Sequence, residues 1–247
     1  MKALQKLMGV AMLAGATMAG AGAANAEGTF SGNVALTSDY VFRGLSQTDG
    51  NPAIQGGFDY LNGSFYAGTW ASNVAFSSGP EIDVYAGFTP TVGPVVLNVG
   101  VIGYFYPGAD DDAANFDFYE GKLAATFTPV DPLSVTGSLY YSPDFFGETD
   151  AALYLEIAAA YVFSDSLSFS GAYGNQTIDD VDGPGPGTVD GDYNTWNLGA
   201  TYSALGFSFD LRYVDTDVDV GDSIATYTTA DESLYDSAAV FTIKRAL

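Results

Sequence analysis

Residues 205–214 read LGFSFDLRYV, a stretch in which apolar and polar side chains alternate. Every second residue from Leu205 to Tyr213 is a large apolar or aromatic one, and Ser208, Asp210 and Arg212 stand between them. Successive side chains of a β-strand point to opposite faces, whereas a helix needs apolar residues at intervals of three and four. The stretch therefore predicts a strand with one apolar and one polar face.

The same alternation recurs throughout the chain in segments of about ten residues, which is typical of an outer-membrane β-barrel. Twelve such segments can be placed, at 29–45, 52–61, 64–76, 80–89, 95–106, 115–128, 133–142, 150–163, 167–176, 193–203, 206–215 and 237–247. After the N-terminal segment, no stretch approaches roughly eighteen consecutive apolar residues, so the sequence predicts no transmembrane helix.

The connections between these segments alternate between tight and loose. Five are tight turns, at 62–63, 90–94, 129–132, 164–166 and 204–205. The other six are mostly longer and acidic, at 46–51, 77–79, 107–114, 143–149, 177–192 and 216–236. A closed antiparallel barrel with both ends in the periplasm has short periplasmic turns and longer outer loops. A soluble β-sandwich also has alternating strands, but nothing would make its loops alternate in length. We therefore expect an all-β, closed transmembrane barrel of about twelve strands.

Residues 1–26 have the three parts of a secretory signal peptide. Lys2 and Lys6 form a positive start, an apolar stretch runs to about Met18, and Ala24-Asn25-Ala26 is an A-x-A cleavage site. The apolar stretch is too short for a transmembrane anchor. We expect cleavage there, with 27–247 forming the barrel in the outer membrane of a Gram-negative cell.

The composition of the chain excludes several classes of function. Its 247 residues include no His and no Cys, with 30 Asp and Glu against 7 Lys and Arg. The absence of His removes an imidazole base for a serine nucleophile, and the absence of Cys removes thiolate chemistry. A formal charge of −23 argues against nucleic acid as a partner. No pair of acids stands out for glycoside hydrolysis, so we expect no enzyme, no catalytic residue, no cofactor and no metal site.

Three stretches carry a family resemblance: SDYVFRGLSQTDGNPAIQGGFD at 38–59, FYAGTWASNV at 65–74 and EIDVYAGF at 81–88. Together they resemble the Gcw_chp family, also described as TorF-type porins of proteobacteria, and VFTIKRAL at 240–247 is similar to its closing strand. The resemblance implies an outer-membrane barrel with a pore. It implies no particular solute, because the family has little assigned chemistry. Leu247 stands where a terminal Phe is expected for the barrel-assembly machinery.

If the apolar face of each strand meets lipid, the opposite face lines the lumen. The charged candidates there are Asp39, Arg43, Asp59, Asp83, Glu120, Lys122, Glu156, Asp210, Arg212 and Lys244. One hypothesis is a porin-like channel for passive diffusion of ions or small polar solutes, with these charges setting its selectivity. The alternative is a non-conducting structural or adhesive barrel that works through its loops, in which the same charges pair and fill the lumen.

The outer loops hold most of the remaining acidic residues. The rim candidates are Asp110, Asp111, Asp112, Asp179, Asp180, Asp182, Asp215, Asp217 and Asp219. An anionic rim attracts cations, which predicts a weak cation preference. Divalent ions bridging these carboxylates to lipopolysaccharide are one interpretation, although such runs are more often solvated faces. The spacing at 215–222 departs from a calcium-binding loop.

Aromatic residues near strand ends are expected in girdles at the two membrane interfaces. The candidates are Tyr40, Phe42, Tyr66, Trp70, Phe88, Phe105, Tyr141, Phe163, Tyr173, Trp196, Tyr202 and Tyr213. Four tyrosines fall instead on the lumen side of the predicted register, at Tyr104, Tyr106, Tyr140 and Tyr154.

Overall fold

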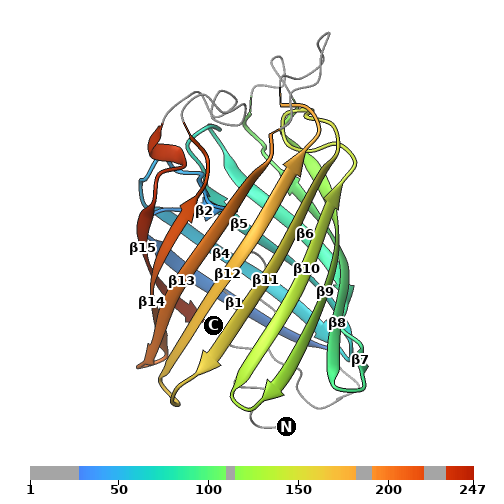
Figure 1. Ribbon diagram of the computed structural model, residues 1–247, viewed down its shortest axis with the longest axis vertical. Helices are drawn as coiled ribbons and strands as arrows, with labels where there is room; N and C mark the ends of the chain where they lie inside the picture. The colour runs from blue at the N-terminus through green and yellow to red at the C-terminus, as the bar shows by residue number, and fades with distance from the viewer. Residues whose placement is uncertain (1–27, 110–114, 182–190, 220–231) are drawn as a thin grey trace.

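The computed structural model describes residues 28–109, 115–181, 191–219 and 232–247. Within these residues, twelve long strands form a closed antiparallel barrel (Figure 1). They are β1 (Thr29–Thr37), β4 (Ala53–Asn62), β5 (Phe65–Asn73), β6 (Pro80–Phe88), β8 (Val95–Phe105), β9 (Phe118–Val130), β10 (Leu133–Ser142), β11 (Ala152–Val162), β12 (Leu167–Ile178), β13 (Tyr193–Ala204), β14 (Phe207–Thr216) and β15 (Ala238–Ala246). Each pairs with its neighbour in sequence, and β1 pairs with β15 to close the ring. The expected fold class is confirmed.

The rhythm of turns and loops is as predicted. All five tight turns lie at one end of the barrel, and the longer connections gather at the other (Figure 1). Gly63, Gly93 and Gly206 give three of the turns their positive φ, of 61°, 60° and 78°, which glycine adopts without strain. In this fold the turn end faces the periplasm and the loop end faces outward. The expected signal peptide, 1–26, lies outside the described residues.

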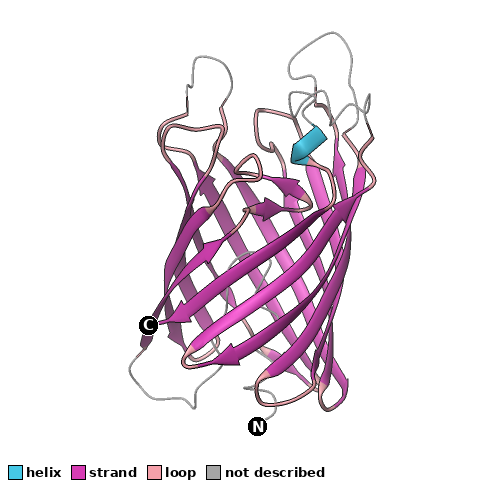
Figure 2. Cartoon of the chain, turned by 90° about the vertical axis from the view of Figure 1, so that its left-hand side faces the viewer, coloured by secondary structure: helices cyan, strands magenta, loops and turns pink. Residues whose placement is uncertain are grey.

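One predicted strand is wrong in its second half. The segment 29–45 was expected to be a single strand, but β1 ends at Thr37. The chain then turns into the barrel and forms a small hairpin from β2 (Val41–Phe42) and β3 (Leu45–Ser46), which lies inside the outer half of the barrel (Figure 2). The alternation of apolar and polar residues continues through this stretch because the hairpin is itself built from strands. The period of two residues therefore did not show that β1 ends at Thr37.

Two other elements are short. The strand β7 (Thr91–Val92) pairs with the start of β8 and belongs to the turn that precedes it. The 3-10 helix η1 (Glu232–Leu234) precedes β15. Among the described residues, no helix is long and apolar enough to cross a membrane.

The two faces of the barrel wall differ in chemistry. Val101, Ile157 and Leu198 point outward and are 62%, 59% and 68% exposed. Carboxylates on the opposite face, including Asp59 and Asp210, are buried. An apolar exterior around a polar interior is the arrangement of an outer-membrane barrel, in which lipid covers the exposed apolar band.

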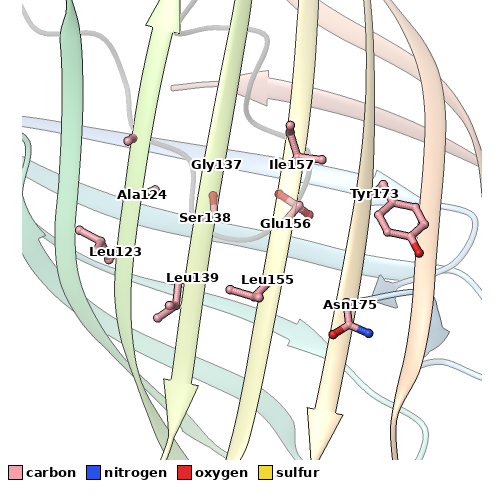
Figure 3. A pocket seen from close by; sticks show the side chains of 11 residues that line it. Leu123, Ala124, Gly137, Ser138, Leu139, Leu155, Glu156, Ile157, Tyr173 and Asn175 are labelled. Carbon is pink, nitrogen blue, oxygen red and sulfur yellow. The ribbon is translucent and has the colours of Figure 1, made fainter.

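The outer surface also has a shallow apolar depression across β9 to β12 (Figure 3). Ala125 and Gly137, which are register partners, leave room there between the larger Leu123, Leu155 and Ile157. An added Cβ at Gly137 would meet no atom within 4 Å. Because its apolar lining belongs to the lipid-facing surface, we treat this depression as part of the lipid contact rather than of the lumen.

A charge placed on the lipid face tests this orientation. Leu198→Arg, at the middle of β13, should lower the free energy of unfolding by about 2–4 kcal/mol, because arginine is costly near the bilayer midplane. Urea unfolding from lipid vesicles measures the change. The control is Leu205→Arg, which makes the same substitution in a periplasmic turn and should cost about 0–1 kcal/mol. Equal losses for the two variants would contradict the orientation.

Candidate functional site in the barrel lumen

The segment 38–52, here called the inward loop, is fixed at its base by Asp39. The carboxylate of this residue accepts hydrogen bonds from Ser46 Oγ at 2.7 Å and Thr48 Oγ1 at 2.8 Å. The backbone N–H of Tyr40 donates to Thr48 Oγ1 at 3.0 Å. Because Asp39 ties both ends of the hairpin together, it fixes the loop in its folded form rather than lining the wall. The sequence predicted that barrel strands alone would supply the residues of the site. The main difference in the structure is that this loop also contributes to it.

From this base the loop reaches the wall on the side of β5 and β6. Tyr40 Oη donates to Glu81 Oε1 at 2.7 Å, and the Tyr40 ring lies edge-on to Trp70 at 5.3 Å between centroids. Burial raises the pKa of the Tyr40 hydroxyl well above its usual value, and Glu81 and Asp83 raise it further. The hydroxyl therefore remains a hydrogen-bond donor near neutral pH.

At the tip of the hairpin, Arg43 extends to the opposite wall. Its Nη2 lies 2.7 Å from Glu120 Oε2, and its Nη1 donates to Gln176 Oε1 at 2.9 Å. The guanidinium carbon lies 4.4 Å from the centroid of the Tyr154 ring and 5.2 Å from that of Tyr140. These contacts join the loop to four strands, β9 to β12.

Burial by itself lowers the pKa of the Arg43 guanidinium, but the Glu120 carboxylate raises it, and the net pKa lies above its usual value. The guanidinium is therefore charged. A buried ion pair of this kind depends on good geometry and on further hydrogen bonds. Glu120 has one such bond, since Tyr104 Oη donates to its Oε2 at 3.0 Å.

Gly44 follows Arg43 and touches a third sector of the wall. A Cβ on Gly44 would lie 2.4 Å from Thr216 Cγ2 and 2.5 Å from Thr195 Oγ1. Both residues of this two-residue turn have positive φ, 48° at Arg43 and 87° at Gly44, as a tight hairpin requires. Glycine is thus needed here both for its backbone conformation and for the space it leaves.

Apolar packing surrounds the loop on both sides. Toward β5–β10, Phe42 and Tyr40 pack against a cluster of buried residues consisting of Tyr66, Val74, Tyr85, Ile102, Tyr104, Tyr106 and Phe118. Toward β11–β14, Leu45 packs against Ala152, Ile178, Val181, Tyr193, Val218 and Tyr235. The outer half of the lumen is therefore narrowed by a packed loop and by the aromatic side chains that receive it.

The periplasmic half of the lumen is lined by polar side chains. Arg212 donates to Asn197 Oδ1 at 2.5 Å and to Ser170 Oγ at 2.8 Å, and lies 3.3 Å from Asp210 Oδ2. The Asp210 carboxylate also accepts from Thr201 Oγ1 at 2.7 Å. This network crosses β12, β13 and β14.

The facing wall of this half carries further polar contacts. Tyr85 Oη donates to Asp59 Oδ1 at 2.6 Å, and Tyr66 Oη donates to Asn98 Oδ1 at 2.7 Å. Nearer the inward loop, Lys122 Nζ lies 5.2 Å from the centroid of the Tyr140 ring, which also contacts Arg43. Charged groups of both signs therefore line the polar interior.

The predicted charged residues divide into two groups by position. Asp39 and Arg43 belong to the inward loop. The other eight lie on the inner faces of barrel strands: Asp59, Asp83, Glu120, Lys122, Glu156, Asp210, Arg212 and Lys244. Four tyrosines predicted to face inward, Tyr104, Tyr106, Tyr140 and Tyr154, also lie inside, either buried or packed against the buried cluster.

Four aromatic residues assigned to the interfacial girdles lie inside instead. Tyr40 and Phe42 are part of the inward loop, Trp70 contacts Tyr40 from β5, and Tyr66, also on β5, is buried inside the barrel. For Tyr40 and Phe42 the girdle assignment depended on 29–45 being one membrane-spanning strand, whereas Tyr66 and Trp70 lie on the inner face of β5. Phe88, Phe163 and Tyr202 are exposed on the outer surface as expected.

Two functional residues escaped sequence reasoning. Glu81 and Gln176 are almost fully buried, and both contact the loop. Glu81 stands two residues before Asp83 on the same strand face, so the period-two pattern could have placed Glu81 in the lumen. Gln176 was a neutral residue at a predicted strand end, and nothing in the sequence indicated its partner.

The predicted rim is only partly described. Asp110, Asp111, Asp112 and Asp182 lie outside the described residues. Asp179, Asp217 and Asp219 are exposed and Asp215 is partly exposed, whereas Asp180 is buried. In the part of the chain that the structure describes, no group of three or more acidic residues is placed to hold a metal ion.

The sequence model of a bacterial family described as a protein of unknown function (Gcw_chp) matches residues 21–247. The chain belongs to the Gcw_chp family. The match covers the stretch that forms the inward loop, so the resemblance to the Gcw_chp family is confirmed. No curated protein matches the chain.

Two solved structures share the barrel fold. The NanC porin matches with a TM-score of 0.55 at 9% identity, over 87% of this chain and 98% of that one. The KdgM porin, solved in complex with disordered oligogalacturonate, matches with a TM-score of 0.53 at 9% identity, over 88% and 98% of the two chains. At this identity the likeness concerns the fold, which is that of outer-membrane porins.

A double-mutant cycle tests the Arg43–Glu120 pair. Arg43→Met should lower the free energy of unfolding by about 3–5 kcal/mol, because it leaves a buried carboxylate without its partner. In the double variant with Glu120→Gln the loss should be smaller than the sum of the single losses. Urea unfolding of the purified barrel measures all three.

The matched control for this cycle is Arg245→Met. Arg245 is an exposed arginine whose guanidinium stacks on Phe207 at 4.8 Å on the outer surface, and its loss should cost less than about 1 kcal/mol. Additive losses at Arg43 and Glu120 would show that the two groups are not coupled.

Proposed function

We propose that this member of the Gcw_chp family is an outer-membrane channel for passive diffusion of ions or small polar solutes, with the inward loop as its constriction. The observation that carries the proposal is the position of this loop, which projects a charged hairpin tip across the interior of a barrel with polar walls. A loop folded into the lumen narrows the path and brings its charges close to any passing solute. The shared fold with porins agrees with this assignment.

The balance of charges favours cations. The inward loop and inner wall carry eight carboxylates against four basic groups among the described residues: Asp39, Asp49, Asp59, Glu81, Asp83, Glu120, Glu156 and Asp210 against Arg43, Lys122, Arg212 and Lys244. Exposed acids at the outer rim add to this excess. A path lined by negative charge concentrates cations and repels anions, so we expect a weak cation preference.

A closed barrel that acts through its loops is the second candidate. The dense aromatic packing around Phe42 and Tyr104 favours it, since the rings of these residues lie 5.9 Å apart within the outer half of the lumen. The two candidates differ in conductance, which is therefore the first property to measure.

Planar-bilayer recording should show stepwise openings for the purified protein, and Gly44→Ala should give several-fold larger steps. The added methyl group would collide with Thr195 and Thr216 and push the hairpin away from the wall. The control is Gly50→Ala in the same loop, where φ is also positive but a Cβ would meet no atom within 4 Å. Silent bilayers for wild type and Gly44→Ala, with heat-modifiable gel migration proving intact barrels, would favour the closed barrel.

Neutralising wall carboxylates should reduce selectivity. Under a salt gradient, the variant with Glu156→Gln and Asp210→Asn should have a reversal potential closer to zero, because two negative charges have left the path. Asp144→Asn in an exposed outer loop is the control and should change the potential less. An unchanged potential in the double variant would remove both residues from the selectivity-determining wall.

A further inference from the structure

The pocket that receives Arg43 has the composition of a ligand site. Each of four adjacent strands supplies one side chain to it: Glu120 from β9, Tyr140 from β10, Tyr154 from β11 and Gln176 from β12. Tyr140 is the register partner of Tyr154, and Tyr154 that of Gln176. Three of the four groups therefore lie side by side in one row of the rigid wall, whereas their occupant comes from a loop.

The polar groups of this pocket are oriented by the wall itself. Gln176 Nε2 donates to the backbone oxygens of Thr177, at 3.0 Å, and of Leu153, at 3.4 Å, so its Oε1 is turned toward Arg43. Tyr104 Oη holds Glu120 Oε2, while Glu120 Oε1 is buried without a hydrogen-bond partner. Both acceptor side chains, Glu120 and Gln176, are therefore held by hydrogen bonds to residues of the wall as well as by Arg43.

The arrangement selects a guanidinium over an ammonium ion. Two acceptors, one charged and one neutral, meet two different nitrogens of the same planar group. Aromatic rings lie against it, at 4.4 Å for Tyr154 and 4.7 Å for the loop's own Phe42. A guanidinium has several donors in a fixed plane and stacks on rings, whereas an ammonium is a compact, strongly hydrated point charge.

We propose that Glu120, Tyr140, Tyr154 and Gln176 form a binding site for small guanidinium compounds, and that Arg43 occupies it as an internal ligand. A solute with this group competes with Arg43 and releases the hairpin from the wall. The effect on permeation rests on the proposed channel function, and small guanidinium compounds are then the class of solute that acts on the channel. The binding site itself does not depend on that function.

Two features make Arg43 a displaceable occupant. Arg43 lies at the tip of a hairpin whose strands, β2 and β3, pair with each other and form a sheet separate from the barrel, so its backbone is not part of the wall. Below the pocket, Tyr154 Oη donates to Glu156 Oε2 at 3.1 Å, so a second carboxylate stands beside the site. That half-buried carboxylate offers an incoming cation a first contact on the periplasmic side.

The test uses Arg43→Ala, which empties the pocket. Calorimetry in detergent micelles should show methylguanidinium binding with millimolar half-saturation, roughly tenfold more tightly than methylammonium of equal charge, since paired charge-assisted hydrogen bonds favour the planar cation. Adding Glu120→Gln to the variant should abolish the difference between the two cations. Equal binding of both cations by Arg43→Ala, or a preference that survives Glu120→Gln, would overturn the proposal.

If Arg43→Ala does not fold unaided, its refolding yield becomes the measurement. Methylguanidinium at millimolar concentration should restore the heat-modifiable band, and methylammonium should not. Failure of both cations to restore it, or equal restoration by both, would overturn the proposal.

Bilayer recording then separates this inference from the channel function. Methylguanidinium should increase the open time of the wild-type channel and reduce the conductance of Arg43→Ala, where it fills the vacant pocket. Selective binding in micelles with silent bilayers would contradict the channel function and leave the site standing. Conductance without selective binding would overturn the site alone.

Discussion

The whole molecule depends on the need to pair every backbone N–H and C=O group that enters lipid. An open sheet would leave two unpaired edges in a medium that offers no hydrogen bonds, so the strands close into a ring through β1 and β15. Closure fixes which face of each strand meets lipid and which meets the lumen, since side chains alternate along every strand. The polar interior, and with it any pathway for a solute, follows from this single constraint.

Inside the ring, a second constraint acts on the charges. Several of the charged groups that face the lumen are buried, and two pairs of them form ion pairs. Two ion pairs are found among the described residues, one between Arg43 and Glu120 and one between Arg212 and Asp210. The first pair attaches a loop to the wall, while the second lies within the wall. The first pair is therefore the contact on which the proposed displacement of the loop by a competing ligand depends.

Local chemistry explains why the loop folds inward. Asp39 draws Ser46 and Thr48 toward itself, Arg43 and Gly44 supply the positive φ values of a tight turn, and Gly44 fits where any Cβ would collide. Each of these residues stands in the stretch that carries the family resemblance. Residues 38–52 of that stretch therefore form the inward loop, and its remaining residues, from Ala53 on, belong to the strand β4.

The sequence by itself determined the barrel, the strand number and the alternation of turns and loops, because these follow from a period of two and from local turn residues. It also placed eight charged residues on the inner faces of strands, since the face of a strand is a local property. Only the tertiary structure decided that β1 stops at Thr37, that Asp39 fastens a loop, and that Arg43 meets Glu120 and Gln176 across the lumen. Those contacts join residues 77 and 133 positions apart, and such pairings depend on closure of the ring, which no local pattern contains.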